Sequence, residues 1–171
     1  MKLLALLAFL VLVIAQGTWL PHLRVAGVMP DAVLVALTSW ALLAGGVAAV
    51  PLAAAAGVLL DIIAGAPLGL SAAALLVAML TVGWWRGTVF STGIGVFVVA
   101  AAMATLFYDA TLLVGLQSLH DPINWPTALR HVVAPSAILN ALLAFPAGYL
   151  CSGLAKRLGV LESTERLHSA G

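Results

Sequence analysis

Residues 53–69, AAAAGVLLDIIAGAPLG, contain the pattern that decides how this chain folds. Four residues of this segment recur at every fourth position and therefore share one face of a helix: Ala53, Gly57, Asp61 and Gly65. Small residues on one face allow a second helix to approach closely. An aspartate on that face predicts contact with protein rather than with lipid, because a carboxylate in hydrocarbon is costly.

The end of the same segment predicts a turn. Gly65, Pro67 and Gly69 do not prolong a regular helix. We expect these three residues to lead the chain into the apolar run that begins at Leu68. The segment therefore predicts a closely packed helix that is followed by a sharp turn into the next helix.

The composition predicts that the solvent of this protein is a lipid bilayer. Of its 171 residues, 64% are hydrophobic and only 8% are charged, whereas a soluble domain carries about 25% charged residues. So few charges cannot cover a surface that faces water. This excludes a disordered chain, a coiled coil and a nucleic-acid-binding domain. With one cysteine, Cys151, and four scattered histidines, we expect no disulfide, metal or cofactor.

The apolar runs predict an all-α bundle of six transmembrane helices. A span needs about 20 mostly apolar residues, and the six expected spans are Leu3–Gly17, Asp31–Gly45, Pro51–Ala64, Leu68–Trp85, Val89–Leu116 and Val132–Leu154. They form a single domain over residues 1–155, and residues 156–171 form a short cytoplasmic tail. The second and third spans are short, so a hairpin that does not reach the far interface is the alternative. The first run is expected to remain as an anchor, although a cleaved signal peptide has a similar pattern.

The basic residues predict the orientation of these spans. If the N-terminus is cytoplasmic, five basic residues lie on the inner side: Lys2, Arg86, Lys156, Arg157 and Arg166. Only Arg24 and Arg130 lie on the outer side, so we expect both termini in the cytoplasm. Residues 83–87, which include Trp84, Trp85 and Arg86, are predicted to form a turn on the inner side.

Polar residues near the outer ends of the spans are the candidates for function, because ionisable groups in membranes are costly. Arg24, Asp109 and Arg130 are predicted to form an outer polar cluster that contacts a partner or a small solute. The alternative is that Asp31 caps a helix, while Asp61 and Asp109 pair with arginines or loop amides. Within the spans, Gln16 and Asn140 are expected to hydrogen-bond to neighbouring helices.

The sequence does not support an intramembrane enzyme. An aspartyl protease would need a Gly-x-Gly-Asp segment, and Val58-Leu59-Leu60 precedes Asp61 instead. A membrane serine protease would need a Gly-x-Ser-Gly turn, and the second glycine is absent after Ser71. Motifs that bind phosphate or metal are absent as well.

The order of these features resembles the rod shape-determining protein MreD family. The resemblance rests on Gln16 near the end of the first span, on Pro30-Asp31 at the start of the second, and on the 57–69 segment. It implies a non-enzymatic component of the inner membrane in the bacterial elongation machinery. Its partners would be MreC, the actin-like MreB, and the RodA glycosyltransferase with its penicillin-binding transpeptidase. It also implies a fold like the solute-capture subunits of energy-coupling-factor vitamin transporters.

Two functions follow from these patterns. In the first, the chain is a membrane scaffold in which one set of residues packs helices or docks an MreC-like partner: Gly57, Asp61, Gly65, Pro67, Gly69, Pro30 and Asp31. In the second, the chain is the substrate-binding membrane subunit of a vitamin transporter, which would need a cavity lined by polar and aromatic residues.

Overall fold

The computed structural model describes residues 2–19, 27–86, 94–119 and 123–157, and every regular element in these ranges is helical. The elements are α1 (Lys2–Thr18), α2 (Ala32–Ala44), α3 (Gly46–Ala64), α4 (Leu70–Arg86), α5 (Ile94–Leu119), α6 (Trp125–Ala128) and α7 (Ala134–Arg157). A π-helical turn, Leu129–Val133, joins α6 to α7. The described ranges therefore contain six helical segments, in the predicted order, with α6, the π-helical turn and α7 forming the last one.

Three segments are long and apolar enough to cross a membrane: Gly46–Ala64, Gly95–Leu119 and Trp125–Leu154. The other three helices, α1, α2 and α4, are apolar but shorter. Together with the composition, these helices identify a membrane protein. The prediction of an all-helical membrane fold is confirmed, although only three of the six predicted spans correspond to helices that are long enough to cross a membrane.

The break between α2 and α3 is tighter than predicted. Gly45 alone separates the two helices and has φ 101°, a conformation that glycine adopts without steric cost. Helix α3 therefore begins at Gly46 rather than at Pro51, and Pro51 lies inside it. The short-hairpin interpretation does not fit α3, which has 19 residues, but α2 has only 13.

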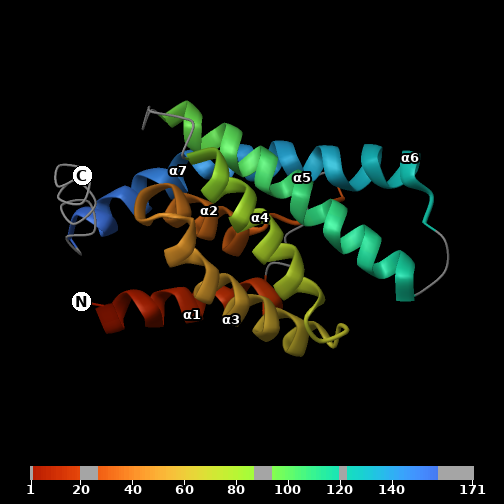
Figure 1. Ribbon diagram of the computed structural model, residues 1–171, viewed down its shortest axis with the longest axis horizontal. Coiled ribbons are helices and arrows are strands. Elements are labelled where there is room, and N and C mark those ends of the chain that lie inside the picture. The colour runs from red at the N-terminus through yellow and green to blue at the C-terminus, as the bar shows by residue number, and fades with distance from the viewer. Residues whose placement is uncertain (1, 20–26, 87–93, 120–122, 158–171) are drawn as a thin grey trace.

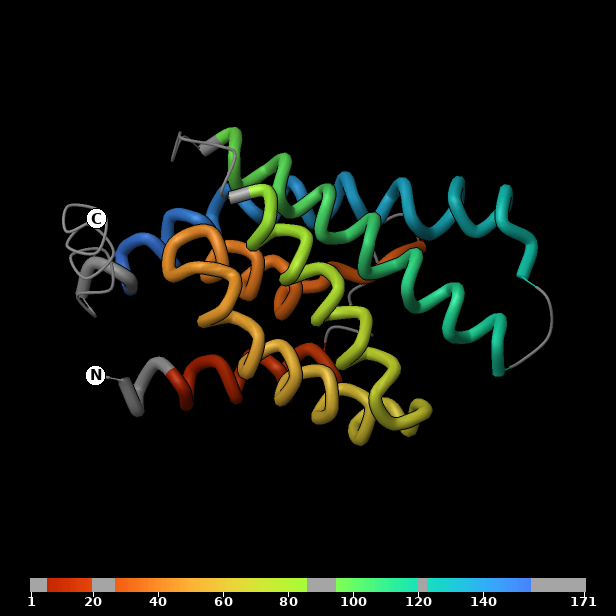
Figure 2. Tube along the Cα trace, viewed as in Figure 1, coloured from red at the N-terminus to blue at the C-terminus, as the bar shows by residue number. Residues whose placement is uncertain are grey.

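Helix α2 is the centre of the bundle. Eight of its residues are buried, among them Val33, Leu34 and Leu37, which are not exposed at all. It packs against α3, α4, α5 and α7, while α1 lies mainly on α3. Figures 1 and 2 show α5 and the α6–α7 rod side by side along one edge of the molecule, with α1 and α3 along the opposite edge. A helix that is apolar all round and buried is expected in such a central position.

Helices α3 and α4 form an antiparallel pair whose backbones come close at both ends. At the start of α3, a Cβ added to Gly46 would lie 2.7 Å from the Cα of Gly83 in α4. The predicted inner turn at residues 83–87 is therefore wrong over its first part, because residues 83–86 continue α4 and Gly83 packs against Gly46. Gly87 lies outside the described residues.

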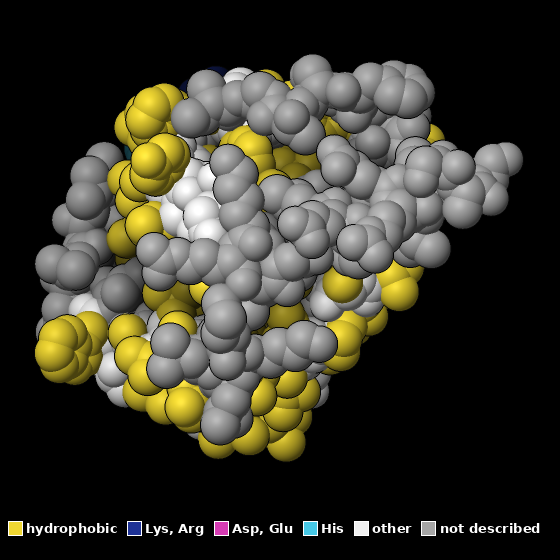
Figure 3. Space-filling model, turned by 90° about the vertical axis from the view of Figure 1, so that its left-hand side faces the viewer, with side chains coloured by type: hydrophobic (Ala, Val, Ile, Leu, Met, Phe, Trp, Pro, Cys, Tyr) yellow, Lys and Arg dark blue, Asp and Glu magenta, His cyan; other side chains and the backbone are white. Residues whose placement is uncertain are grey.

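The two ends of the molecule differ. Helices α1 and α5 begin, and α4 and α7 end, at the left in Figure 1, where both termini lie. The α3–α4 turn, the end of α5 and α6 lie at the other end. Seen from the end with the termini, the described side chains around the edge are largely hydrophobic (Figure 3). The expected tail begins at Lys156, but α7 continues through Arg157, and residues 158–171 lie outside the described part.

Candidate functional site

Helix α2 begins inside the bundle. The backbone N–H of Asp31, just before α2, donates to Oδ1 of Asn140 at 2.8 Å. Asn140 is 1% exposed and lies near the middle of the Trp125–Leu154 span. The start of α2 is therefore enclosed by other helices, where water is excluded and the free N–H groups of a helix N-terminus need partners from the protein.

Side chains from three helices satisfy these N–H groups. Oε1 of Gln16 in α1 accepts from the N–H of Val33 at 2.7 Å. Oδ1 of Asp31 accepts from the N–H of Leu34 at 2.8 Å and from Nε2 of Gln16 at 2.6 Å. With the bond from Asp31 to Asn140, three of the N–H groups at this terminus, those of Asp31, Val33 and Leu34, have acceptors. Asp31 therefore caps a helix, as one of the two interpretations of the sequence expected.

The network continues into α5. Nδ2 of Asn140 donates to Oγ1 of Thr105 at 3.1 Å, and Thr105, which is not exposed, donates to the carbonyl oxygen of Ala101 at 2.7 Å. We refer to Gln16, Asp31, Thr105 and Asn140 as the cap network. It joins α1, α2, α5 and α7. The predicted hydrogen bonds of Gln16 and Asn140 to neighbouring helices are confirmed.

Asp61 closes the α3–α4 turn. Its carboxylate is not exposed, and it accepts from the N–H of Gly69 at 2.8 Å and from the N–H of Ser71 at 3.0 Å. Gly65 (φ 63°) ends α3 in the left-handed conformation, and Gly69 has φ 95°. Asp61 is bound to loop amides and not to an arginine. Its carboxylate satisfies the free N–H groups at the start of α4, as Asp31 does for α2.

The predicted small-residue face lies against α4. A Cβ added to Gly57 would be 2.8 Å from the carbonyl carbon of Ser71 and closer still to the backbone of Ala72. Ala53 and Asp61 on the same face are not exposed at all, whereas Gly65 and Pro67 in the turn are exposed. The inner part of this face is therefore filled by the protein itself and offers no surface to a partner.

The predicted outer polar cluster is not brought together in the described part of the chain. Arg130 is exposed in the π-helical turn, and Arg24 lies outside the described residues. Asp109 is half-buried, and its Oδ2 is buried without a hydrogen-bond partner among the described residues.

Tyr108 in α5 is 8% exposed and belongs to the larger cluster of buried hydrophobic residues. Thr105 and Tyr108 were not predicted from the sequence, because a single threonine or tyrosine in an apolar run belongs to no recognisable motif. Only the packing of α5 shows which residues surround them.

Removing one acceptor oxygen from Asp61 should destabilise the turn. In Asp61→Asn, the new NH₂ group does not accept a hydrogen bond, so the N–H of Gly69 or of Ser71 loses its partner. Leaving a buried donor unsatisfied costs about 1–3 kcal/mol. We expect a loss of this size in the free energy of unfolding of the purified protein.

Asp109→Asn is the matched control for Asp61→Asn, since it makes the same chemical change at a carboxylate whose buried oxygen has no described partner. We expect no loss of stability from this variant. An equal loss from both variants would show that the charge, and not the pair of hydrogen bonds, is what matters at Asp61.

The arrangement offers structural chemistry rather than a reaction centre. No three His, Cys, Asp or Glu side chains within the described ranges lie where they could hold a metal ion. The polar side chains of the cap network and Asp61 are engaged in closing helix termini. The larger cavity, of about 660 Å³, is lined almost entirely by aliphatic side chains.

The comparisons with known proteins give one result. The family model of the rod shape-determining protein MreD matches residues 1–152, which include α1 to α6 and all but the last five residues of α7. No curated protein and no solved structure matches the chain, so the likeness to vitamin-capture subunits stays a prediction. The match covers the cap network and the Gly57–Gly69 segment, and it establishes that this chain belongs to the MreD family.

Proposed function

We propose that this chain is a scaffold of the rod complex in the bacterial cytoplasmic membrane and that it binds an MreC-type partner. The match to the MreD family carries the proposal, because members of this family are non-enzymatic membrane proteins that determine rod shape. RodA with its transpeptidase, and MreB, would belong to the same complex. The chain would then help to organise lateral peptidoglycan synthesis.

The use of the buried polar groups supports a scaffold. Gln16, Asp31, Asp61 and Asn140 all satisfy backbone N–H groups at helix termini. Groups engaged in this way fix the relative positions of helices and are not free to act on a substrate. A bundle whose helices are held together by internal hydrogen bonds presents a constant outer surface to a partner helix.

The ends of the helices support both termini in the cytoplasm. Lys2 opens α1, Arg86 closes α4, and Lys156 and Arg157 close α7, all at one end of the molecule. Arg130 lies in the segment at the other end. Cytoplasmic ends carry the excess of basic residues. A fluorescent protein fused after Gly171 should therefore be fluorescent in the cytoplasm, and fusion of a periplasmic reporter there should be inactive.

The partner would dock outside the α3–α4 contact, because α4 already covers Gly57 and Asp61. We propose that its anchor helix packs on the lipid-facing surface and that the outer end, where Arg130 is exposed, fixes its register. Vitamin capture is less well supported, since the larger cavity lacks the polar side chains that would orient such a ligand.

Co-purification tests the scaffold role. The tagged chain is co-expressed with the MreC-type protein of the same organism and extracted in mild detergent. We expect near-stoichiometric recovery of the partner, and a severalfold loss when the partner's anchor helix is replaced by an unrelated one. Arg130→Glu should lower recovery, whereas Asn124→Asp, at an exposed site of the same end, should not. Recovery no higher than that of an unrelated single-span protein would reject the proposal, and a vitamin retained through purification would favour the transporter.

A further inference from the structure

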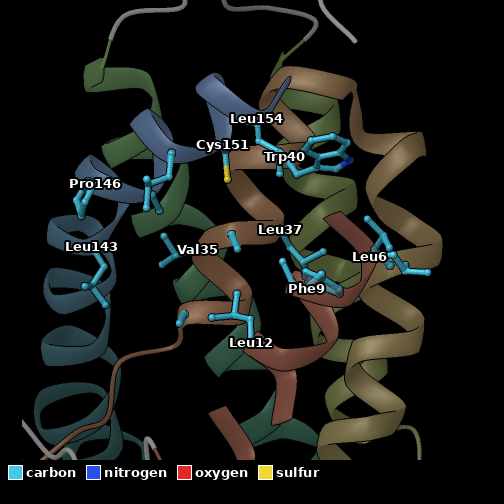
Figure 4. A pocket seen from close by; sticks show the side chains of 16 residues that line it. Leu6, Phe9, Leu12, Val35, Leu37, Trp40, Leu143, Pro146, Cys151 and Leu154 are labelled. Carbon is cyan, nitrogen blue, oxygen red and sulfur yellow. The ribbon is translucent and has the colours of Figure 1, made fainter. Parts of the chain in front are cut away.

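An apolar groove lies between α1 and α7, and α2 forms its floor. Its volume is about 660 Å³, and its walls include Phe9 of α1, Trp40 of α2 and Ala147 of α7. Figure 4 shows the labelled side chains of α1 and α7 on opposite sides, with Trp40 close to Leu154 at one end. Leu6 is 54% exposed and Leu150 is 71% exposed, so the groove is open to the surrounding lipid.

The chemistry of the groove fits a hydrocarbon chain. The Trp40 indole and the Cys151 thiol are the only side chains in its lining that can form a hydrogen bond. An apolar chain gives up no polar interaction when it enters the groove, and the walls of the groove make dispersion contacts with it on several sides. The groove is therefore suited to an acyl chain and not to a polar solute.

The charges at one end of the groove identify the head group. Helix α1 begins at Lys2 and α7 ends at Lys156 and Arg157, at the end of the molecule where Leu154 lines the groove. The sequences of α1, α2 and α7 contain no acidic residue. Within these three helices, the charged residues at this end are therefore all basic and lie beside an apolar channel, which is the combination found where anionic lipids bind.

The same charge argues against a protein helix as occupant. Single-span partners carry Lys and Arg at their cytoplasmic ends, so such a helix would bring positive charge to Lys2, Lys156 and Arg157. We propose that the α1–α7 groove binds one acyl chain of an anionic phospholipid, whose phosphate is held at the end where these three residues stand in the chain. The choice of occupant rests on the proposed orientation, in which this end is cytoplasmic, but the lipid site can fail or hold independently of the scaffold role.

Quenching of Trp40 tests the proposal directly. Trp19, Trp84, Trp85 and Trp125 are replaced by Phe, and the full chain is reconstituted in phosphatidylcholine vesicles. Brominated acyl chains quench an indole in contact with them. We expect dibrominated phosphatidylglycerol to reach half-maximal quenching at a mole fraction at least about fivefold lower than dibrominated phosphatidylcholine, since one basic residue near the membrane surface strengthens anionic lipid binding about fivefold.

Two sets of variants locate the lipid. Replacing Lys2, Lys156 and Arg157 by Ala should bring the two lipids to within about twofold of each other. Ala147→Phe, which fills the groove, should abolish the extra quenching, whereas Ala141→Phe on another part of α7 should leave it unchanged. In the protein with its native tryptophans, native mass spectrometry should show a bound phosphatidylglycerol that Ala147→Phe removes.

Other outcomes would overturn the proposal. Equal quenching by the two lipids, or a preference that survives the triple Ala variant, would show that the charged end selects no head group. If neither brominated lipid quenches Trp40, a second copy of the chain or another part of the protein covers the groove. If the chain with Trp40 alone does not fold, the mass-spectrometric comparison of wild type with Ala147→Phe decides the question.

Discussion

Gly57→Leu is expected to prevent α3 and α4 from packing, and we expect no monodisperse protein after purification. Even a Cβ at Gly57 would overlap the backbone of Ala72 and lie 2.8 Å from the carbonyl carbon of Ser71. Backbone atoms of a helix cannot change rotamer to make room, so the two helices must separate. Separation would break the bonds from Gly69 and Ser71 to Asp61 and would expose the turn. The yield and elution profile in detergent measure the effect.

Gly57→Ala gives a milder form of the same test. In an ordinary helix interior, Ala is more favourable than Gly by about 0.8–1.0 kcal/mol. At Gly57 we expect the opposite sign, a loss of about 1–3 kcal/mol, because overpacking of a close contact costs about that much. Gly95→Ala is the control, since a Cβ at Gly95 meets nothing within 4 Å. Similar stability of the two alanine variants would contradict the close approach of α3 and α4.

Asn140→Leu is expected to unfasten the start of α2. The substitution conserves approximate side-chain size, but it leaves the N–H of Asp31 without its acceptor and Oγ1 of Thr105 without its donor. A buried donor left unsatisfied costs about 1–3 kcal/mol. We expect a loss of this size in the free energy of unfolding. Hydrogen exchange at residues 31–34 should also become faster, because the terminus of α2 opens when its cap is weakened.

Two threonines of α5 distinguish the contribution of the cap network to stability from the general effect of removing a hydroxyl group. Thr105 bonds to Asn140 as well as to its own helix, whereas Thr111 bonds only to the carbonyl oxygen of Phe107 in its own helix. Thr105→Val should cost about 0.5–1.5 kcal/mol, and Thr111→Val should cost close to nothing. In a double-mutant cycle, Thr105→Val and Asn140→Leu should be non-additive. Additive effects would show that the cap network does not act as a unit.

The cap network explains why a short helix can lie at the centre of a membrane protein. Helix α2 has 13 residues and begins inside the bundle, where free N–H groups without a partner would be costly. Gln16, Asp31 and Asn140 provide acceptors from three separate segments of the sequence.

Much of the fold could be predicted because its causes are local. Apolar runs interrupted by Gly and Pro marked the helices, and the four-residue spacing of Ala53, Gly57 and Asp61 marked the packed face of α3. The start of α3 was placed five residues too late, at Pro51 instead of Gly46. Proline is best tolerated in the first turn of a helix, which favoured a start at Pro51, but Pro51 lies in the second turn of α3 and one glycine with positive φ was enough to make the break.

The site was harder to predict because the local sequence does not show which groups will form hydrogen bonds with one another in the folded protein. Asp31 and Asp61 were both recognised as costly carboxylates. Asp31 could either cap a helix or contact a partner, and Asp61 could pair either with an arginine or with loop amides. In the folded protein, both carboxylates accept hydrogen bonds from backbone amides. The packing also placed Arg130 on the surface, away from the buried oxygen of Asp109, so the expected outer cluster did not form among the described residues.

The sequence by itself determined that this protein lives in a bilayer, that it is helical, and that one acidic, glycine-bearing helix face must be covered by protein. Composition and periodicity are sufficient for these conclusions, because the costs of charge and of free backbone groups in hydrocarbon depend only on residue type and spacing. Only the tertiary structure decided that α4 covers this face, that α2 begins inside the bundle, and that Gln16, Thr105 and Asn140 share one network. These contacts join residues as far apart as Asp31 and Asn140, and only the folded arrangement of all the helices brings them within hydrogen-bonding distance.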